Sequence, residues 1–210
     1  MNTIADVPLV AILRGITPGE ILAHLAALET AGFSRAEIPL NSPQWPDSLA
    51  QAIRYAGSRM AIGAGTVTRP ELVDQVAQIG CRFILTPNTD PAVIQQACAS
   101  KMTSVIGCLT PSEAFSALHY GASALKIFPA GEMGPEYISA LRAVLPSGTR
   151  LWATGGITPD NLPVFLAAGC CGAGLGSDLY RAGQSPDETL HNAQRFIRAW
   201  QASSDLAAHG

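Results

Sequence analysis

Short apolar runs recur along the chain, and each is followed by a longer stretch with helical periodicity. Such runs, bounded by glycine, proline or polar residues, are typical of strands buried on both faces. We predict strands over Pro8–Leu13, Arg35–Leu40, Met60–Gly65, Phe83–Thr86, Thr103–Ile106, Ala124–Phe128, Leu151–Thr154 and Gly172–Leu175. We predict helices over Glu20–Ala31, Glu71–Ile79, Pro91–Ser100, Ser112–Tyr120, Pro135–Val144, Asn161–Ala168 and Pro186–Ala202. Eight strand–helix units predict an α/β fold, a (βα)8 TIM barrel, as a single domain over residues 1–210.

A weak internal repeat supports this interpretation. The same helix-start chemistry follows every second strand, beginning at Thr17, Thr68, Thr110 and Thr158. A threonine can cap the free amides of a helix, and a glutamate three positions later completes a capping box. The repeat therefore indicates structure, and we assign it no chemistry.

Composition narrows the class of protein. The 210 residues are 48% hydrophobic and 14% charged, which excludes a disordered chain and suits strands buried on both faces. A net charge of −3 without a basic stripe makes nucleic acid an unsuitable partner. The apolar run before Arg14 is too short for a signal peptide or a membrane span. Five cysteines without CxxC spacing indicate reduced thiols, so we expect a cytoplasmic protein with no metal site and no cofactor.

Lys126 is the most informative residue, because it lies inside the apolar run Ala124–Phe128 and only two residues of the chain are lysine. Burial disfavours the ammonium form, so the pKa of such a lysine falls and its amine becomes nucleophilic. That is the state a Schiff-base enzyme requires. The structural alternative is a lysine at a strand end that reaches solvent or pairs with a carboxylate.

Glu37 is the matching carboxylate, embedded in the second predicted strand. In a poorly solvated site it would act as a general acid and base. Its structural alternative is an ion pair with a nearby arginine. Both side chains could point into one barrel mouth.

Glycine-rich turns follow the last two predicted strands, in Thr154-Gly155-Gly156-Ile157 and Gly174-Leu175-Gly176-Ser177. Loops in these positions form the recurrent phosphate site of TIM barrels, because glycine lets backbone amides approach an anion. Arg14, which ends the first strand, would be a charged neighbour for an anionic substrate. The strand ends together give the candidate site: Arg14, Glu37, Asn41, Thr66, Pro87, Lys126, Phe128, Thr154, Gly155, Gly156, Gly176 and Ser177.

Motifs along nearly the whole chain resemble the class I aldolases that cleave 2-keto-3-deoxy-6-phospho sugar acids. The matching segments are Ala11–Ile16, Glu37–Pro43, Ile62–Val67, Thr86–Asn88, Leu125–Pro129 and Leu175–Tyr180. Asn41-Ser42-Pro43 and Gly176-Ser177-Asp178-Leu179-Tyr180 resemble most closely the members that act on the galactonate epimer. Thr154 departs from that branch, which more typically carries valine there, so the gluconate epimer or both epimers remain an alternative.

The resemblance implies a mechanism and partners. Lys126 would form the Schiff base and Glu37 would shuttle protons, while Arg14, Thr66, Gly156, Gly176 and Ser177 match substrate contacts. The substrate would be a phosphorylated keto-deoxy sugar acid, with pyruvate as a product, in a homotrimer without cofactors. Two other classes stay open: a phosphate-binding barrel isomerase or synthase in which Lys126 is only a charge, and a non-catalytic sugar-phosphate sensor.

Overall fold

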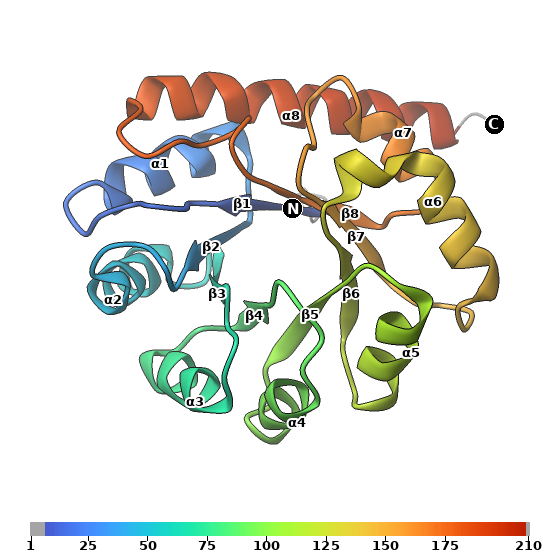
Figure 1. Ribbon diagram of the computed structural model, residues 1–210. Helices are drawn as coiled ribbons and strands as arrows, with labels where there is room; N and C mark the ends of the chain where they lie inside the picture. The colour runs from blue at the N-terminus through green and yellow to red at the C-terminus, as the bar shows by residue number, and fades with distance from the viewer. Residues whose placement is uncertain (1–6, 209–210) are drawn as a thin grey trace.

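The computed structural model describes residues 7–208, in which eight parallel strands close into a barrel surrounded by helices (Figure 1). Each strand pairs with the next, and β8 pairs with β1. The strands are β1 (Leu9–Ile12), β2 (Arg35–Pro39), β3 (Ala61–Gly65), β4 (Phe83–Leu85), β5 (Thr103–Cys108), β6 (Ala124–Ile127), β7 (Leu151–Thr154) and β8 (Gly172–Leu175). The helices are α1 (Ile21–Ala31), α2 (Trp45–Ala56), α3 (Pro70–Ile79), α4 (Pro91–Ala99), α5 (Pro111–His119), α6 (Ala130–Val144), α7 (Leu162–Ala167) and α8 (Pro186–Ala208). The predicted TIM barrel is confirmed, although the predicted domain of 1–210 extends at both ends beyond the described residues.

Helices α2, α6 and α8 differ from the sequence prediction, and α8 ends at Ala208 rather than Ala202. Helix α2 was not among the predicted helices, because Pro43 and Pro46 flank its start and make the segment look like a loop; Pro46 is tolerated in the first turn, where its missing N–H costs nothing. Helix α6 begins at Ala130 rather than Pro135, since a short helical turn precedes a kink at Gly134, which has φ 79° and ψ 164°.

The threonine repeat is only partly a set of helix caps. Thr110 forms the complete capping box with Glu113. Thr158 makes a similar reciprocal pair, but with Asn161. The prediction was wrong for Thr17 and Thr68, because the N-caps of α1 and α3 are Glu20 and Arg69, and neither helix start has a side-chain cap bond.

A small apolar cluster fills the inside of the barrel, separate from the large core beneath the helices: Val10, Phe83, Leu85, Val105, Ala124 and Trp152. Glycines on neighbouring strands make room for its two aromatic rings. A Cβ at Gly63 would lie 2.3 Å from the Phe83 ring, and one at Gly172 would lie 3.0 Å from the Trp152 ring. The glycine content of the strands therefore follows from filling a narrow barrel with large side chains.

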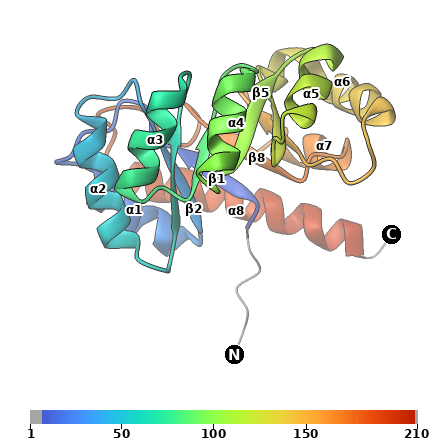
Figure 2. The same ribbon diagram turned by 90° about the horizontal axis from the view of Figure 1, so that it is seen from below.

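Helix α8 packs against α1 and α7 and so covers the seam where the barrel closes (Figures 1 and 2). None of the helices described between residues 7 and 208 is long and apolar enough to cross a membrane.

Candidate active site

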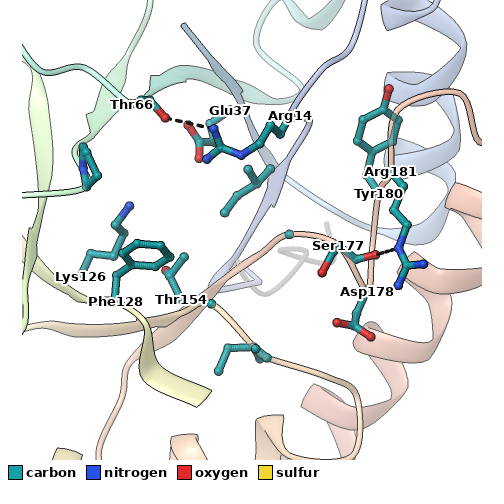
Figure 3. Close-up of a pocket in the computed structure, with 16 residues that line it drawn as sticks. Arg14, Glu37, Thr66, Lys126, Phe128, Thr154, Ser177, Asp178, Tyr180 and Arg181 are labelled. Atoms are coloured by element: carbon teal, nitrogen blue, oxygen red, sulfur yellow. Dashed lines mark hydrogen bonds between the residues drawn. The ribbon is translucent and has the colours of Figure 1, made fainter. Parts of the chain in front are cut away.

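A cavity of about 480 Å³ opens at the carboxyl ends of the strands (Figure 3). Of the twelve predicted site residues, only Asn41 is not part of its lining. In Figure 3, Lys126 and Phe128 lie on one side of the cavity, and Ser177, Asp178 and Arg181 lie on the other. The lining also contains five residues that the sequence analysis did not nominate: Ile12, Ile157, Asp178, Tyr180 and Arg181.

Lys126 projects into the cavity from β6, a strand that is buried along its whole length. Lys126 is 7% exposed, so it does not reach bulk solvent, and no salt bridge within residues 7–208 pairs it with a carboxylate; neither form of the structural alternative is therefore supported. Burial lowers the pKa of Lys126, nearby Glu37 partly opposes that shift, and the positive charge of Arg14 adds to it. The Nζ atom lies 5.1 Å from the centroid of the Phe128 ring. Burial and the charge of Arg14 favour the neutral, nucleophilic amine.

Glu37 on β2 is 2% exposed, and its Oε2 atom has no hydrogen-bond partner among the described residues. Burial raises its pKa to about 7, with Lys126 and Arg14 acting in the opposite direction. No salt bridge within residues 7–208 ties Glu37 to an arginine, which disfavours its purely structural interpretation. A carboxyl group with a pKa near neutrality can both accept and return a proton.

Arg14 is held at the rim of the cavity by two side chains from neighbouring loops. Its Nη1 donates to Oδ1 of Asn41 at 2.7 Å and to Oγ1 of Thr66 at 3.4 Å. Thr66 has φ 57°, a left-handed conformation that is costly for a β-branched residue and is often found at functional sites. Asn41 thus contacts Arg14 and lies outside the cavity lining, so a direct contact between Asn41 and a ligand stays a prediction.

The two glycine-rich turns present free backbone donors to the cavity. Among the described residues, the amides of Gly156, Ile157 and Ser177 have no hydrogen-bond partner. Their turns are fixed from behind, because Asn161 donates to the Gly156 carbonyl at 2.8 Å and Arg181 Nε donates to the Ser177 carbonyl at 2.9 Å. Free amides on a fixed loop are well suited to an anionic group such as phosphate.

Arg181 is the residue of this group that the sequence analysis missed. It stands four positions after Ser177, directly after the matched segment Leu175–Tyr180, and it places a cation beside the free amides.

Thr154 ends β7 with a buried hydroxyl in the cavity wall. The residue is 4% exposed, and its Oγ1 has no partner in the described chain. A buried hydroxyl without a partner is costly, so this atom is a candidate for contact with a bound polar ligand.

Metal chemistry has no evident location in residues 7–208, where no three His, Cys, Asp or Glu side chains are grouped to hold an ion. All five cysteines are free thiols.

Comparison with known proteins places the chain in a family. The family model for KDPG and KHG aldolases matches residues 1–194. The chain belongs to this aldolase family. Within the family it is 55% identical to the 2-dehydro-3-deoxy-6-phosphogalactonate aldolase of Escherichia coli (strain K12), over 92% of this chain and 95% of that protein.

Two solved structures extend the comparison of this aldolase. A native KDPGal structure has a TM-score of 0.94 and 53% identity, covering 96% of this chain and 98% of that one. A cube-shaped, highly porous protein cage, designed by fusing symmetric oligomeric domains, has a TM-score of 0.96 and 52% identity, covering 98% of this chain and 76% of that one. The family and the fold expected from the sequence are therefore both confirmed.

Proposed function

We propose that this aldolase reversibly cleaves 2-dehydro-3-deoxy-6-phosphogalactonate to pyruvate and D-glyceraldehyde 3-phosphate through a Schiff base on Lys126. The observation that carries the proposal is the pair of buried groups in one cavity: an amine whose pKa is lowered and a carboxyl group whose pKa is raised to about 7. Titratable groups shifted in opposite directions within a cavity are typical of acid–base and nucleophilic catalysis.

Lys126 supplies the covalent step. Its neutral amine attacks the C2 ketone of the substrate, and loss of water leaves a protonated imine in which C2 accepts electrons. The bond between C3 and C4 then breaks, its electron pair forms an enamine, and the C4 fragment leaves as glyceraldehyde 3-phosphate. Hydrolysis of the imine after C3 is protonated returns the amine and releases pyruvate.

Glu37 carries the protons. As carboxylate it accepts the C4 hydroxyl proton, directly or through a water, while the C3–C4 bond breaks. As carboxylic acid it then returns a proton to C3 of the enamine. A pKa of about 7 suits both halves of this cycle, because neither protonation state is strongly disfavoured near neutral pH.

Substrate binding divides between the two ends of the cavity. Arg14, oriented by Thr66 and Asn41, is a suitable partner for the carboxylate at C1, next to the reacting carbon. The free amides after β7 and β8, with Ser177 and Arg181 beside them, suit the phosphate at C6. Pro87, Phe128 and Gly155 complete the wall between these ends.

The galactonate epimer is favoured by the relative that is 55% identical, which is named a 2-dehydro-3-deoxy-6-phosphogalactonate aldolase. The unpartnered hydroxyl of Thr154 is the one observation in favour of the gluconate epimer as an alternative or second substrate. Steady-state cleavage of the two purified epimers tests the assignment. A higher kcat/KM for the galactonate epimer supports it, and a preference for the gluconate epimer contradicts it.

The competing classes make different demands on Lys126. An isomerase or synthase would use it only as a charge, and a sensor would need no chemistry at all; neither needs a desolvated amine next to an unpaired carboxyl group. Release of pyruvate from either phosphorylated epimer, followed with lactate dehydrogenase, separates the aldolase from both.

We further propose a homotrimer in the cytoplasm. Large apolar side chains are exposed on α5 and at the start of α6, at Phe115 and Met133, where a second copy would cover them. A similar chain forms part of a designed cage of symmetric oligomeric domains. Sedimentation velocity tests the trimer: a species of three chains is expected, and a monomer across the concentration range contradicts it.

A further inference from the structure

A second cavity, of about 230 Å³, lies at the opposite end of the barrel from the active site. Several of its lining residues open their strands: Arg35 begins β2, Ala61 begins β3, Phe83 begins β4 and Thr103 begins β5. The cavity therefore lies at the amino-terminal ends of the strands, whereas the active site lies at their carboxyl ends. We call them the lower cavity and the upper cavity, respectively. In TIM barrels this face generally serves stability rather than catalysis.

The apolar cluster inside the barrel separates the two cavities. Val10, Ala124 and Trp152 line the lower cavity, and each precedes a residue of the active-site lining by two positions. Because alternate residues of a strand face the same side, these side chains all point into the barrel. The rings of Phe83 and Trp152 thus close the inner end of the lower cavity, and they lie between this cavity and the layer of side chains that contains Lys126.

The lower cavity is strongly cationic at its rim. Arg35, Arg82 and Arg150 line it, and no aspartate or glutamate is found among the lining residues that the structure describes. Nη1 of Arg35 donates to the Val7 carbonyl at 2.9 Å, and Nη2 of Arg82 donates to the Gly57 carbonyl at 3.2 Å. The side chain of Arg150 makes no hydrogen bond or ion pair within residues 7–208. A guanidinium has five N–H donors, so Arg82 and Arg150 offer several unused donors to an anion.

Trp152, at the inner end of the lower cavity, gives a second indication of a ligand. Trp152 is only 5% exposed, yet its Nε1–H has no hydrogen-bond acceptor among the described residues. A buried donor without an acceptor is unfavourable, and a small movement of the ring would let it meet an acceptor in the cavity. Cavities of about 150 Å³ accept a benzene ring, so the observed volume has room for a compact ring and a small charged group.

We propose that this lower cavity is a binding site for a phosphate monoester with a compact apolar body, distinct from the active site. The phosphate contacts Arg82 and Arg150, which suit its several oxygens through paired N–H donors. The apolar body packs against Phe83 and Trp152. This site does not depend on the aldolase mechanism, because it shares no lining residue with the active site.

Phenyl phosphate is the probe that tests the site, because it joins a phosphate to a single ring. Titration of the intact protein is followed by tryptophan fluorescence, which reports on Trp152, and by calorimetry, which does not depend on that signal. Phenol is the neutral control ligand. Arg150→Gln and Arg82→Gln change exposed residues of the lower rim, and Arg181→Gln makes the same change in the upper cavity. Circular dichroism checks that the three variants are folded.

Saturable binding that is weakened about tenfold or more by Arg150→Gln and by Arg82→Gln is expected, since each removes a charged hydrogen-bonding group. Because the active site also offers a phosphate site, calorimetry is expected to resolve a second binding event, which Arg181→Gln weakens. The event that the lower-rim variants weaken is expected to persist in Arg181→Gln, and phenol is expected not to saturate. Absence of saturation at millimolar probe overturns the proposal. So does a single binding event that Arg181→Gln weakens and that the two lower-rim variants leave unchanged.

Discussion

The carboxyl group of Glu37 occupies space that Gly65 leaves open: a Cβ at Gly65 would stand 1.4 Å from Oε2 of Glu37. Gly65 is the last residue of β3, which pairs with β2 in parallel and sets Pro39 opposite Gly65. The absence of a side chain on one strand therefore fixes where the carboxyl group of the next strand can lie.

Gly65→Ala is expected to displace the Glu37 carboxyl group and to reduce aldol cleavage by roughly 10²-fold or more, the range seen when a general acid or base is lost. Imine formation with pyruvate should persist, because Lys126 is on a different strand. Steady-state kinetics and borohydride trapping measure the two effects. Gly19→Ala is the matched control, since a Cβ there meets nothing within 4 Å. An equal loss of aldol cleavage in Gly65→Ala and Gly19→Ala would show that Gly65 does not determine the position of the Glu37 carboxyl group.

Glu37→Gln is expected to form the pyruvate imine but to exchange its C3 protons slowly, by roughly 10²–10⁴-fold. The amide keeps the shape of the side chain and cannot shuttle a proton. Deuterium incorporation into pyruvate, followed by NMR, is the measurement. Exchange at the wild-type rate would remove Glu37 from the mechanism.

The raised pKa of Glu37 also predicts how stability depends on pH. The pKa of this carboxyl group is about 7 in the folded chain against an ordinary value of 4.5, so between these values the folded state binds more protons than the unfolded state. The contribution of Glu37 to the free energy of unfolding is therefore lost as pH rises from 4.5 to 7. Glu37→Gln has no carboxyl group to titrate and should not show this loss. The free energy of unfolding of the variant minus that of the wild type should therefore be larger at pH 8 than at pH 5. Urea unfolding of both proteins at pH 5 and pH 8 tests this. A difference in free energy of unfolding between variant and wild type that is the same at both pH values would contradict the raised pKa.

Thr154→Val is expected to shift the ratio of kcat/KM toward the galactonate epimer while leaving pyruvate imine formation intact. The Thr154 hydroxyl is buried without a partner and lines the cavity, so it can bond one C4 epimer, which valine of similar shape cannot. The change in discrimination should be about 1–3 kcal/mol, or roughly 5- to 150-fold. Kinetics on both epimers with wild type and variant give this ratio. An unchanged ratio would assign the choice of epimer to another part of the cavity.

Much of the fold and of the site is predictable, because the strands and the residues at their ends can be recognised from short stretches of sequence. The strands stand out as apolar runs, and the position of Lys126, Glu37 and Thr154 near strand ends is enough to bring them to one mouth. The clearance that Gly65 gives Glu37 was not predictable, since it depends on the register between β2 and β3 rather than on either segment. The same holds for Asn41, whose Oδ1 meets Arg14 from a loop 27 positions away. Helix α2 was missed because its prolines resemble a loop until packing decides otherwise.

The central claim is that Lys126 forms the Schiff base, and trapping with borohydride tests it most directly. Wild-type protein incubated with pyruvate and sodium borohydride should gain the mass of one reduced pyruvate adduct, located by peptide mapping on the segment that contains Lys126. Lys126→Arg should gain none, because a guanidinium does not deprotonate to form an imine. Lys101→Arg, which changes the only other lysine, should label as wild type does. An adduct that persists in Lys126→Arg, or that maps to Lys101, would contradict the account.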